Sequence, residues 1–491
     1  MNPLTSETFD ANARAALTDE QLRSALRNAT SLFGKRRLAA AGSIDNWEEL
    51  RSQARAIKDE TLLHLDQYLE EFTANAETAG AIIHWARDAA EANMIVCNLA
   101  HERNARLAVK SKSMVTEEIH LNTALEAAGI EAVETDLGEY IIQLAGETPS
   151  HIIAPAIHKT KKQIAELFAN KLGIERTNDI AKLTSTARQV LRDKFAAADI
   201  GISGVNFAVA ETGTILILEN EGNIRFTTSL PKIHIALMGI EKVIPRFVDL
   251  EVFLKLLPRS GTGQHLTAYQ SLITGTKRNA DEEGPAELHI ILLDNGRSRM
   301  LAHPTTRQSL ACIRCGACLN ACPVYQQIGG HAYGSVYPGP IGAVITPQLF
   351  GLAKASQLPY ASSLCGACRD VCPVKIDIPQ LLLYLRAEIT EGSRQKTIGR
   401  PQEKLPLKPV ERLAFKMWAA VMTRPRLYEW SGKVFGVLQR LAIRNGKIGK
   451  LNGLLGRVAP PLRAWTAARD LRPIEAQTFR EQWRKSLKRD V

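Results

Sequence analysis

No stretch of about 18 uninterrupted apolar residues occurs in the 491-residue sequence, so it offers no candidate for a membrane-spanning helix. The first residues, MNPLTSETFDANARAALTDEQL, contain neither a basic segment nor an apolar core, which argues against a secretion signal. No G-x-G-x-x-G motif follows an expected strand, and the nearest approach, GTGQHL from Gly261, lacks the last glycine. These absences predict a cytoplasmic protein and give no support for a bound NAD or flavin.

Length and charge indicate several regions of different character. A chain of 491 residues is too long for one hydrophobic core, and 45% hydrophobic residues indicate a globular protein. The net charge of +11 is uneven, because residues 391–491 contain 23 Lys and Arg against 8 Asp and Glu. This balance of +15 leaves the preceding residues at about −4, so the basicity belongs to the C-terminal segment.

Hydrophobic periodicity predicts an open-sheet α/β fold followed by a helical ferredoxin-type module and a basic helical tail. The expected boundaries are a helical lead-in over 1–80, an α/β domain over 81–300, a ferredoxin-like domain over 301–392, and a Pro-containing linker with a basic helical region over 393–491. The expected strands are RLAVKSKS, EAVETDLG, HIIAPAIH and ELHIILLDNGR, and the expected helices are KKQIAELFANKLG and residues 184–195. FAVAETGTILILENEGNIRF is expected to form a hairpin that turns at ENEGN, with a tight bend at ETG before it.

Seven of the eight cysteines lie between positions 312 and 372, and in a cytoplasmic protein such clustering favours metal ligation over disulfides. CIRCGACLNACP places Cys312, Cys315, Cys318 and Cys322 in the C-x2-C-x2-C-x3-C-P spacing of bacterial [4Fe-4S] sites. Three thiolates of this loop reach one cluster and the fourth reaches the neighbouring cluster. Zinc is disfavoured, since zinc sites pair two C-x2-C units.

The second motif, SSLCGACRDVCPVK, has one cysteine fewer. Aligning its Cys-Pro on the first motif puts Ser362 where the first cysteine should be. Because the last cysteine of each motif binds the cluster of the other motif, this alignment gives two ligand sets. They are Cys312, Cys315, Cys318 and Cys372 for a complete first cluster, and Cys322, Cys365 and Cys368 for a second cluster that lacks one thiolate.

Three outcomes stay open for the second cluster. It is a [3Fe-4S] cluster, a [4Fe-4S] cluster with a Ser362 or Ser363 oxygen on the odd iron, or one closed by water or a partner's group. Because a serine hydroxyl ionises far less readily than a thiol, we expect a labile fourth iron. Two adjacent clusters are typical of electron transfer, with the chemistry taking place elsewhere.

The expected α/β domain offers charged side chains at strand ends. Lys110 and Lys112 end a strand in VKSKS, and Glu117 and Glu118 follow at a helix start. These residues could bind an acidic substrate or nucleotide, or they could form a helix-capping loop with solvated charges.

Carboxylates and histidines form a second set of candidates. Glu134, Asp136 and Glu139 in ETDLGE suit a metal or acid-base chemistry, but also a helix N-terminus that complements its dipole. His151 and His158 are either ligands or structural histidines, and the structural interpretation is favoured.

RSGTGQHLT supplies a possible anion cradle from Gly261, Thr262, Gly263 and Gln264. Glu211 stands at a sharp strand end in AETGT. The sequence identifies no partner residue for it, and no catalytic residue is assigned.

The basic tail contains Trp418, Trp430, Trp465 and Trp483. Basic, Trp-bearing helices suit either an anionic membrane surface, where a quinone pool could accept electrons, or docking onto partner subunits. Nucleic-acid binding is disfavoured, because no recognised module is present.

Several long strings together resemble the lactate utilization protein B family over nearly the whole chain. They are VKSKSMVTEEI, ETDLGEYIIQLAGETPSHII, FAVAETGT, ENEGN, GQHLTAY, LLDNGRS, CIRCGACLNACPVY, GGHAYGSVYPGPIGA and SSLCGACRDVCPVKI. The resemblance implies an α/β domain related in fold to sugar-phosphate isomerases and CoA transferases, followed by the ferredoxin-like module. It also implies that all seven cysteines are ligands and that Ser362 is a family trait.

The same resemblance implies a three-protein complex that oxidises L-lactate to pyruvate without NAD and allows growth on lactate. In it the chain would be an electron carrier rather than a catalytic site by itself. The alternatives are a regulatory module that senses a ligand or redox state, and the iron-sulfur subunit of another 2-hydroxy-acid or heterodisulfide-type oxidoreductase.

Overall fold

The computed structural model describes residues 6–279, 282–391 and 409–441 and, with gaps, residues 443–487. The chain divides into two compact units, Met1–Leu405 and Pro406–Val491. The expected linker KTIGRPQEKLPLKPVERL lies largely outside the described residues.

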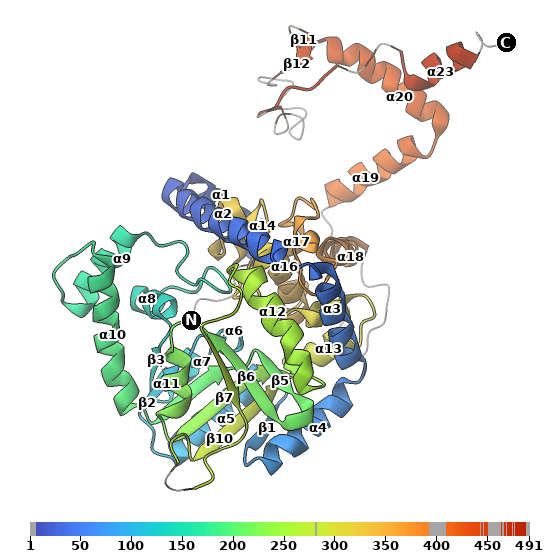
Figure 1. The fold of residues 1–491 in the computed structure, drawn as a ribbon. Helices are drawn as coiled ribbons and strands as arrows, with labels where there is room; N and C mark the ends of the chain where they lie inside the picture. Colours follow the sequence, from blue (N-terminus) through green and yellow to red (C-terminus); the bar gives the residue numbers. More distant parts are fainter. Residues whose placement is uncertain are drawn as a thin grey trace. The chain divides into compact units, whose positions relative to one another are not determined.

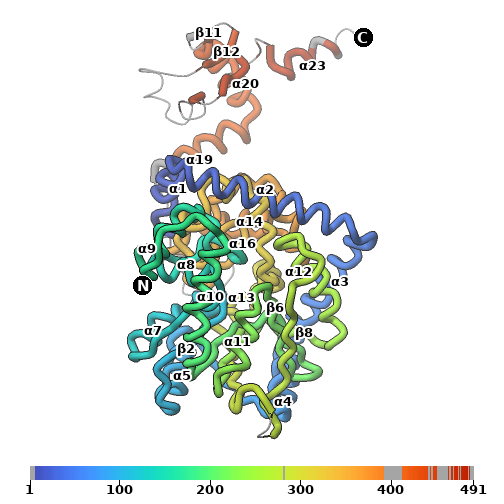
Figure 2. Tube along the Cα trace, turned by 60° about the vertical axis from the view of Figure 1, so that its left-hand side comes forward, coloured from blue at the N-terminus to red at the C-terminus, as the bar shows by residue number. Residues whose placement is uncertain are grey.

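The chain begins with four helices, α1 (Phe9–Thr18), α2 (Glu20–Gly42), α3 (Trp47–Leu63) and α4 (Leu65–Thr78). Asp19 starts α2 by accepting a hydrogen bond from the Leu22 N–H. Each helix turns an apolar side inward, with Leu26 on α2 and Leu50 on α3 almost fully buried. Helix α2 runs across the first helix of the cysteine-rich module, α14 (Ala317–Ala321) (Figure 2). The N-terminal helices therefore belong to the same body as the module.

A six-stranded parallel sheet with the order β1-β10-β7-β4-β2-β3 forms the centre of the first unit. Its strands are β1 (Ile82–Ala86), β2 (Leu107–Lys110), β3 (Glu131–Glu134), β4 (Ile200–Gly204), β7 (Ile233–Gly239) and β10 (Glu287–Leu293). Successive residues of β7 pack on opposite faces, with Ile235 and Leu237 on one and Ala236 and Met238 on the other. The expected open parallel α/β sheet is confirmed.

Helices and a second sheet cover the central sheet (Figure 1). Helices α5 (Ala89–Glu102) and α7 (Leu121–Ala127) pack on one face, and α4 with the second sheet packs on the other. Three helices pack beside β2 and β3, namely α8 (Leu137–Ala145), α9 (Lys161–Leu172) and α10 (Ile180–Ala197). Helices α9 and α10 confirm the two helices expected there.

The second sheet has the order β8-β5-β6-β9, formed by β5 (Phe207–Val209), β6 (Thr214–Glu219), β8 (Val243–Ile244) and β9 (Tyr269–Ile273). The hairpin of β5 and β6 turns at Ala210–Gly213, where Gly213 has a φ of 66°. The hairpin therefore turns at the bend expected at ETG, and the expectation that it turns at ENEGN is wrong. That segment connects β6 to α11 (Asn223–Ser229), because the Glu219 carboxylate accepts the Ile224 N–H at the helix start.

The expected strand HIIAPAIH is also wrong, since residues 151–158 form turns and no strand. The His151 ring accepts hydrogen bonds from the N–H groups of Ile153 and Ala154. A side chain thus takes the backbone donors that a strand would pair with a neighbour.

The cysteine-rich module is helical and follows α12 (Leu250–Gly261) and α13 (Arg297–Leu301) in the chain. Its helices are α14, α15 (Tyr325–Ile328), α16 (Gly339–Phe350), α17 (Ala367–Asp370) and α18 (Ile378–Glu391). One hydrophobic core runs from Leu26 and Phe253 to Leu382. The module is thereby packed into the α/β domain and the N-terminal helices.

The second unit contains α19 (Pro409–Met422), α20 (Pro425–Leu438), a two-residue hairpin of β11 (Ile443–Arg444) and β12 (Lys447–Ile448), and α23 (Phe479–Leu487). Of the four tail tryptophans, Trp465 lies outside the described residues. In the part of the chain that the structure describes, no helix is both long enough and apolar enough to span a membrane.

Candidate iron-sulfur centres

The two cysteine loops repeat the same backbone with an offset of fifty residues. Arg314 and Leu364 both adopt the left-handed conformation that non-glycine residues rarely take, with φ of 60° and 55°. The glycines that follow, Gly316 and Gly366, have φ of 73° and 88° and each precedes a short helix. Ser362 therefore stands at the backbone position that Cys312 occupies in the first loop.

Four cysteines surround one small space of about 20 Å³. They are Cys312, Cys315, Cys318 and Cys372, so the fourth comes from the second motif. Among the described residues, no three cysteine sulfurs lie within 4.8 Å of one another. A tetrahedral zinc site would hold its sulfurs roughly 3.8 Å apart. The wider spacing fits a cluster of several irons and not a single zinc ion.

The chemistry of these sulfurs also fits an iron-sulfur cluster. Burial raises the pKa of Cys372 to about 11 and raises the pKa of Cys315 as well. A thiolate in this place needs positive charge nearby, which the irons of a cluster would supply. The Cys372 sulfur in addition accepts a hydrogen bond from the Ile376 N–H at 3.3 Å, a contact of the kind that tunes cluster potentials.

The remaining three cysteines form a second group. Burial, and then the neighbouring Cys322, raise the pKa of Cys368 to about 12, and Cys365 adds to the effect. Cys322 and Cys368 are buried, whereas Cys365 is exposed. Cys365 therefore brings this group to the protein surface, whereas in the first group Cys312 is half-buried and the other three cysteines are buried.

Ser362 is half-buried and its hydroxyl oxygen accepts a hydrogen bond from the Leu364 N–H at 3.1 Å. Ser363 is exposed. The hydroxyl of Ser362 thus folds back onto its own loop, an ST-turn contact that competes with metal ligation.

Arginines from distant segments lie beside the first group. Arg51 on α3 donates to the Cys372 carbonyl at 2.8 Å, and Arg37 on α2 donates to the Val371 carbonyl at 3.3 Å. The pKa of Cys315 also senses Arg37, which lowers it against the larger effect of burial. Such cations stabilise the reduced, more negative state of a nearby cluster.

A buried ion network connects the module to the α/β domain. Arg297 on α13 donates two hydrogen bonds of 2.9 Å to Glu118 and one of 2.6 Å to Glu241. Burial would raise the pKa of Glu241, but Arg297 and then Arg314 lower it to about 2. The Tyr337 hydroxyl of the module donates to Glu118 at 2.6 Å. The alternative of a solvated charge at Glu118 is therefore wrong, because its side chain is almost fully buried.

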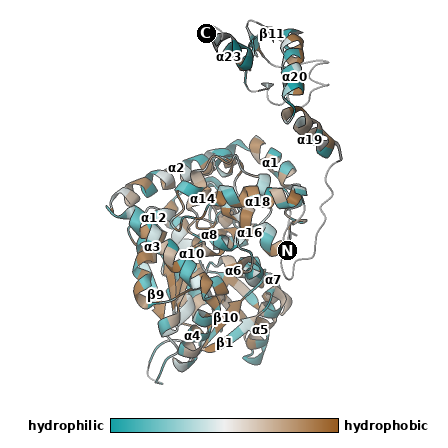
Figure 3. Cartoon of the chain, turned by 90° about the vertical axis from the view of Figure 1, so that its right-hand side faces the viewer, coloured by the Kyte–Doolittle hydropathy of each residue, from teal (hydrophilic) through white to brown (hydrophobic). Residues whose placement is uncertain are grey.

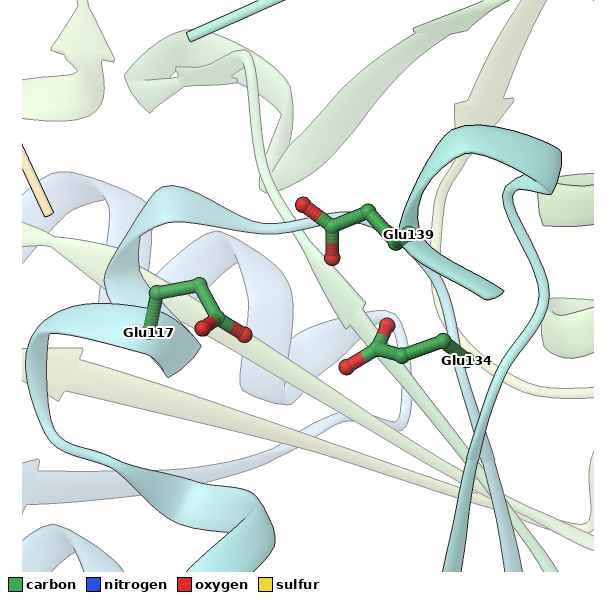
Figure 4. A group of neighbouring side chains, drawn as sticks. All are labelled: Glu117, Glu134 and Glu139. Carbon is green, nitrogen blue, oxygen red and sulfur yellow. The ribbon is translucent and has the colours of Figure 1, made fainter. Parts of the chain in front are cut away.

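A second buried network surrounds Lys110, at the end of β2. Its Nζ lies 2.7 Å from Glu134 and 3.2 Å from Glu117. Glu117, Glu134 and Glu139 point toward one another (Figure 4). Burial opposes the charge of Lys110, but the carboxylates of Glu134 and Glu117 raise its pKa overall. Burial, and then Glu134, raise the pKa of Glu139 well above its usual value, and Lys110 opposes this effect.

The other candidates of the α/β domain have mostly structural partners. Asp136 caps α8 by accepting the Glu139 N–H, and Glu211 accepts the Phe247 N–H at 2.7 Å. Burial lowers the pKa of His151 to about 3, and its Nε2 faces Asn320 at 3.1 Å. His158 bridges Ser150 and Glu147. The structural interpretation of both histidines fits this geometry.

Lys112 and the segment from Gly261 to Gln264 line a cavity that also reaches Arg314 and Cys315. Sequence reasoning missed Arg37, Arg51, Lys242 and Arg314. Arg314 lies inside the first cysteine motif, and this position alone could have indicated that its side chain lies near the cysteine ligands. The other three lie in ordinary helical or turn sequences whose proximity to the cysteines arises only on folding.

Comparison with known proteins agrees with this architecture. Residues 69–293 match the LUD domain, residues 308–376 match the 4Fe-4S dicluster domain, and residues 384–488 match the C-terminal domain of lactate utilisation protein B. The cysteine-rich module is thus an iron-sulfur domain.

Curated relatives extend the similarity over nearly the whole chain. The lactate utilization protein B of Shouchella clausii is 42% identical over 99% of this chain and 98% of its own length. That of Bacillus pumilus is 42% identical over 99% of this chain and 98% of its own length. That of Geobacillus sp. is 43% identical over 98% of this chain and 97% of its own length. Because the similarity reaches 42–43% identity over nearly the full length of both chains, the chain belongs to the lactate utilization protein B family.

Proposed function

We propose that the chain is the iron-sulfur electron-transfer subunit of an NAD-independent complex that oxidises L-lactate to pyruvate. The observation that carries the proposal is the pairing of a four-cysteine group, buried except at Cys312, with a neighbouring three-cysteine group that is exposed at Cys365. The names of its relatives support lactate utilization as the process.

The proposed ligands are Cys312, Cys315, Cys318 and Cys372 for a [4Fe-4S] cluster. Cys322, Cys365 and Cys368 would hold a second cluster of [4Fe-4S] or [3Fe-4S] type. The clusters carry single electrons, while the protein sets their potentials through burial, hydrogen bonds to sulfur and nearby arginines. Electrons would leave or arrive through the exposed second group, because transfer to a partner requires close approach.

The partners proposed are the other lactate utilization proteins, in a three-component complex, with a membrane quinone as the acceptor. The relationship of the α/β domain to sugar-phosphate isomerases and CoA transferases likewise remains a proposal. No catalytic residue is assigned to the chain by itself.

The test is to purify the protein anaerobically with the proteins that co-purify from its own cells, and to record EPR spectra before and after L-lactate. New reduced-cluster signals are expected. A spectrum that responds to dithionite but not to L-lactate, with all three components present, would contradict the assignment.

The second unit supports peripheral attachment to a membrane. Helices α19 and α20 show both hydrophobic and hydrophilic residues (Figure 3), and Phe415, Trp418, Trp430 and Phe435 are all more than half exposed. Exposed aromatic side chains in a segment of charge +15 suit an anionic lipid surface.

Vesicle flotation with and without anionic lipid tests this attachment. The double variant Trp418→Ser/Trp430→Ser should float less than the unmodified protein. Trp85→Ser is the control, because Trp85 is equally exposed on an edge strand of the first unit. Equal flotation of all three proteins would remove the membrane proposal.

A further inference from the structure

A cavity of about 260 Å³ lies between the carboxyl ends of the sheet strands and the first cysteine loop. Its walls come from the residues that follow β2, β3, β4 and β6, from the end of α12, and from Arg314 and Cys315. The carboxyl ends of parallel strands are the usual location of ligand sites in open sheets. A Cβ at Gly261 would lie 2.8 Å from the Cys315 carbonyl oxygen, so the cavity wall is packed directly against the cluster loop.

The carboxylates of this cavity are already engaged by the backbone. Glu219 accepts the N–H groups of Ile224 and Arg225 at 2.7 and 3.1 Å. Glu221 accepts the Leu137 N–H at 3.1 Å, and Asp136 accepts the Glu139 N–H at 3.1 Å. Each carboxylate therefore serves the start of a helix, where negative charge is favoured.

The cationic side chains of the cavity lack comparable hydrogen-bond partners within the described part of the chain. Lys242 is 8% exposed, and no hydrogen bond or ion pair joins the Nζ of Lys242 or of Lys112 to another described residue. Burial lowers the pKa of Lys242 to about 8, and Glu241 and Cys312 nearby only partly oppose this effect. Arg314 is nine-tenths buried, reaches Glu241 only at 3.6 Å, and has a buried Nη1 with no partner among these residues. Buried cationic groups without acceptors carry a large desolvation cost unless an anion binds them.

The remaining walls suit a short carbon skeleton. Ile153, Leu218 and Leu257 provide apolar surface. Asn206 uses its Oδ1 to accept the Leu218 N–H, which leaves its amide N–H groups for a ligand oxygen. The volume lies just below the ~300–1,000 Å³ of sites for drug-sized ligands, which favours a small metabolite over a dinucleotide.

We propose that this cavity binds a small 2-hydroxy or 2-oxo monocarboxylic acid, with its carboxylate on Lys112, Lys242 and Arg314 and its carbon chain against Leu218 and Leu257. This inference rests on the proposed function for the choice of acid, and it deepens that function by locating the acid in this chain beside the first cysteine group. The second oxygen of the acid would face Asn206.

The test is equilibrium dialysis of labelled L-lactate and labelled pyruvate with the anaerobically purified holoprotein. Saturable binding of at least one acid is expected. Lys242→Met and Lys112→Gln should each weaken binding at least tenfold, with the iron content and the visible cluster absorbance unchanged. Lys112 is half-buried, so its variant keeps the test valid if Lys242→Met does not fold.

Lys162→Gln is the matched control, because this exposed lysine on α9 does not line the cavity, and its variant should bind as the unmodified protein does. Binding should also change the EPR spectrum of the reduced first cluster. Inorganic phosphate at the same concentration should not displace the acid, since displacement by phosphate would reduce the cavity to a general anion site and overturn the proposal.

Absence of binding for both acids, or equal binding by all variants, would also overturn it. Neither result would test the electron-transfer proposal, which depends on reduction of the clusters in the complete complex. Conversely, clusters that stay oxidised with lactate and all partners would refute that function while leaving the measured binding in place.

Discussion

Tyr337 donates a 2.6 Å hydrogen bond to the carboxylate of Glu118, although the two residues belong to different domains and lie 219 positions apart. Glu118 starts the chain of contacts through Arg297 to Glu241 and Arg314, which ends inside the first cysteine motif. A buried, charge-assisted contact of this kind fixes the iron-sulfur module against the end of the sheet.

Tyr337→Phe should lower the thermal unfolding midpoint of the holoprotein by a few degrees. The variant removes a hydrogen bond to a charged group, worth about 1.5–3 kcal/mol, but keeps the ring under the Arg314 guanidinium. Tyr269→Phe is the control, because the Tyr269 ring is exposed and packs against Arg225. Equal midpoints for Tyr337→Phe and the control would show that the bond contributes nothing.

Cys322→Ala should remove the EPR signals of the second cluster and leave the four irons of the first. Although Cys322 belongs to the first motif, its sulfur interacts electrostatically with Cys365 and Cys368 of the second group. Cys372→Ala should have the opposite effect, because Cys372 lines the space of the first group. Iron content and EPR spectra measure both variants, and loss of the first cluster in Cys322→Ala would refute crosswise ligation.

Ser362→Cys should give a second cluster that retains four irons through mild aerobic handling. The left-handed backbone two residues later, at Leu364, repeats that of the first motif, so the new thiol stands where Cys312 stands in its own loop. The unmodified protein should give seven irons per chain under the same handling. Ser363→Cys, one residue away and exposed, should behave like the unmodified protein. Eight irons in the unmodified protein would remove the labile-iron hypothesis.

Acidification should destabilise the α/β domain through His234. Burial lowers the pKa of this ring to about 3, and its Nε2 lies 2.7 Å from the Ser203 hydroxyl. The unfolded chain takes up this proton below about pH 6.5, so the stability due to neutral His234 is present above that pH and is lost as the pH falls toward 3. Between pH 7 and 5 the loss is about 2 kcal/mol.

Thermal unfolding at several pH values measures this loss. His234→Gln should show a smaller decrease of the midpoint with falling pH than the unmodified protein. His265→Gln, at an exposed ring, should leave the pH dependence unchanged. Identical pH profiles for His234→Gln and the unmodified protein would contradict the assignment.

The strands and cysteine motifs could be predicted because their signals are local. Runs such as ELHIILL are apolar at successive positions, as a strand buried on both faces requires, and they form β10. The apolar residues of HIIAPAIH look similar, but the His151 ring takes the backbone donors there. ENEGN has turn composition, and only the capping bond from Ile224 to Glu219 shows that a helix starts after it.

The surroundings of the candidate clusters could not be predicted in the same way. Cysteine spacing identifies the type of ligand without any knowledge of the fold. By contrast, Arg51 approaches the first cysteine group from 321 positions before Cys372, and Lys242 lines a cavity with Cys315. Lys110 and Glu118 are residues whose burial could not be predicted from the sequence pattern. They are charged residues in a loop-like sequence, and folding buries both in ion networks that periodicity does not encode.

The contact between Arg51 and the Cys372 carbonyl spans 321 positions of the chain and has a consequence for synthesis. A ribosome that adds about 5–20 residues per second needs roughly 15 to 60 s to pass from one to the other. Helices α2 and α3 thus leave the ribosome well before the last cysteine that they cover.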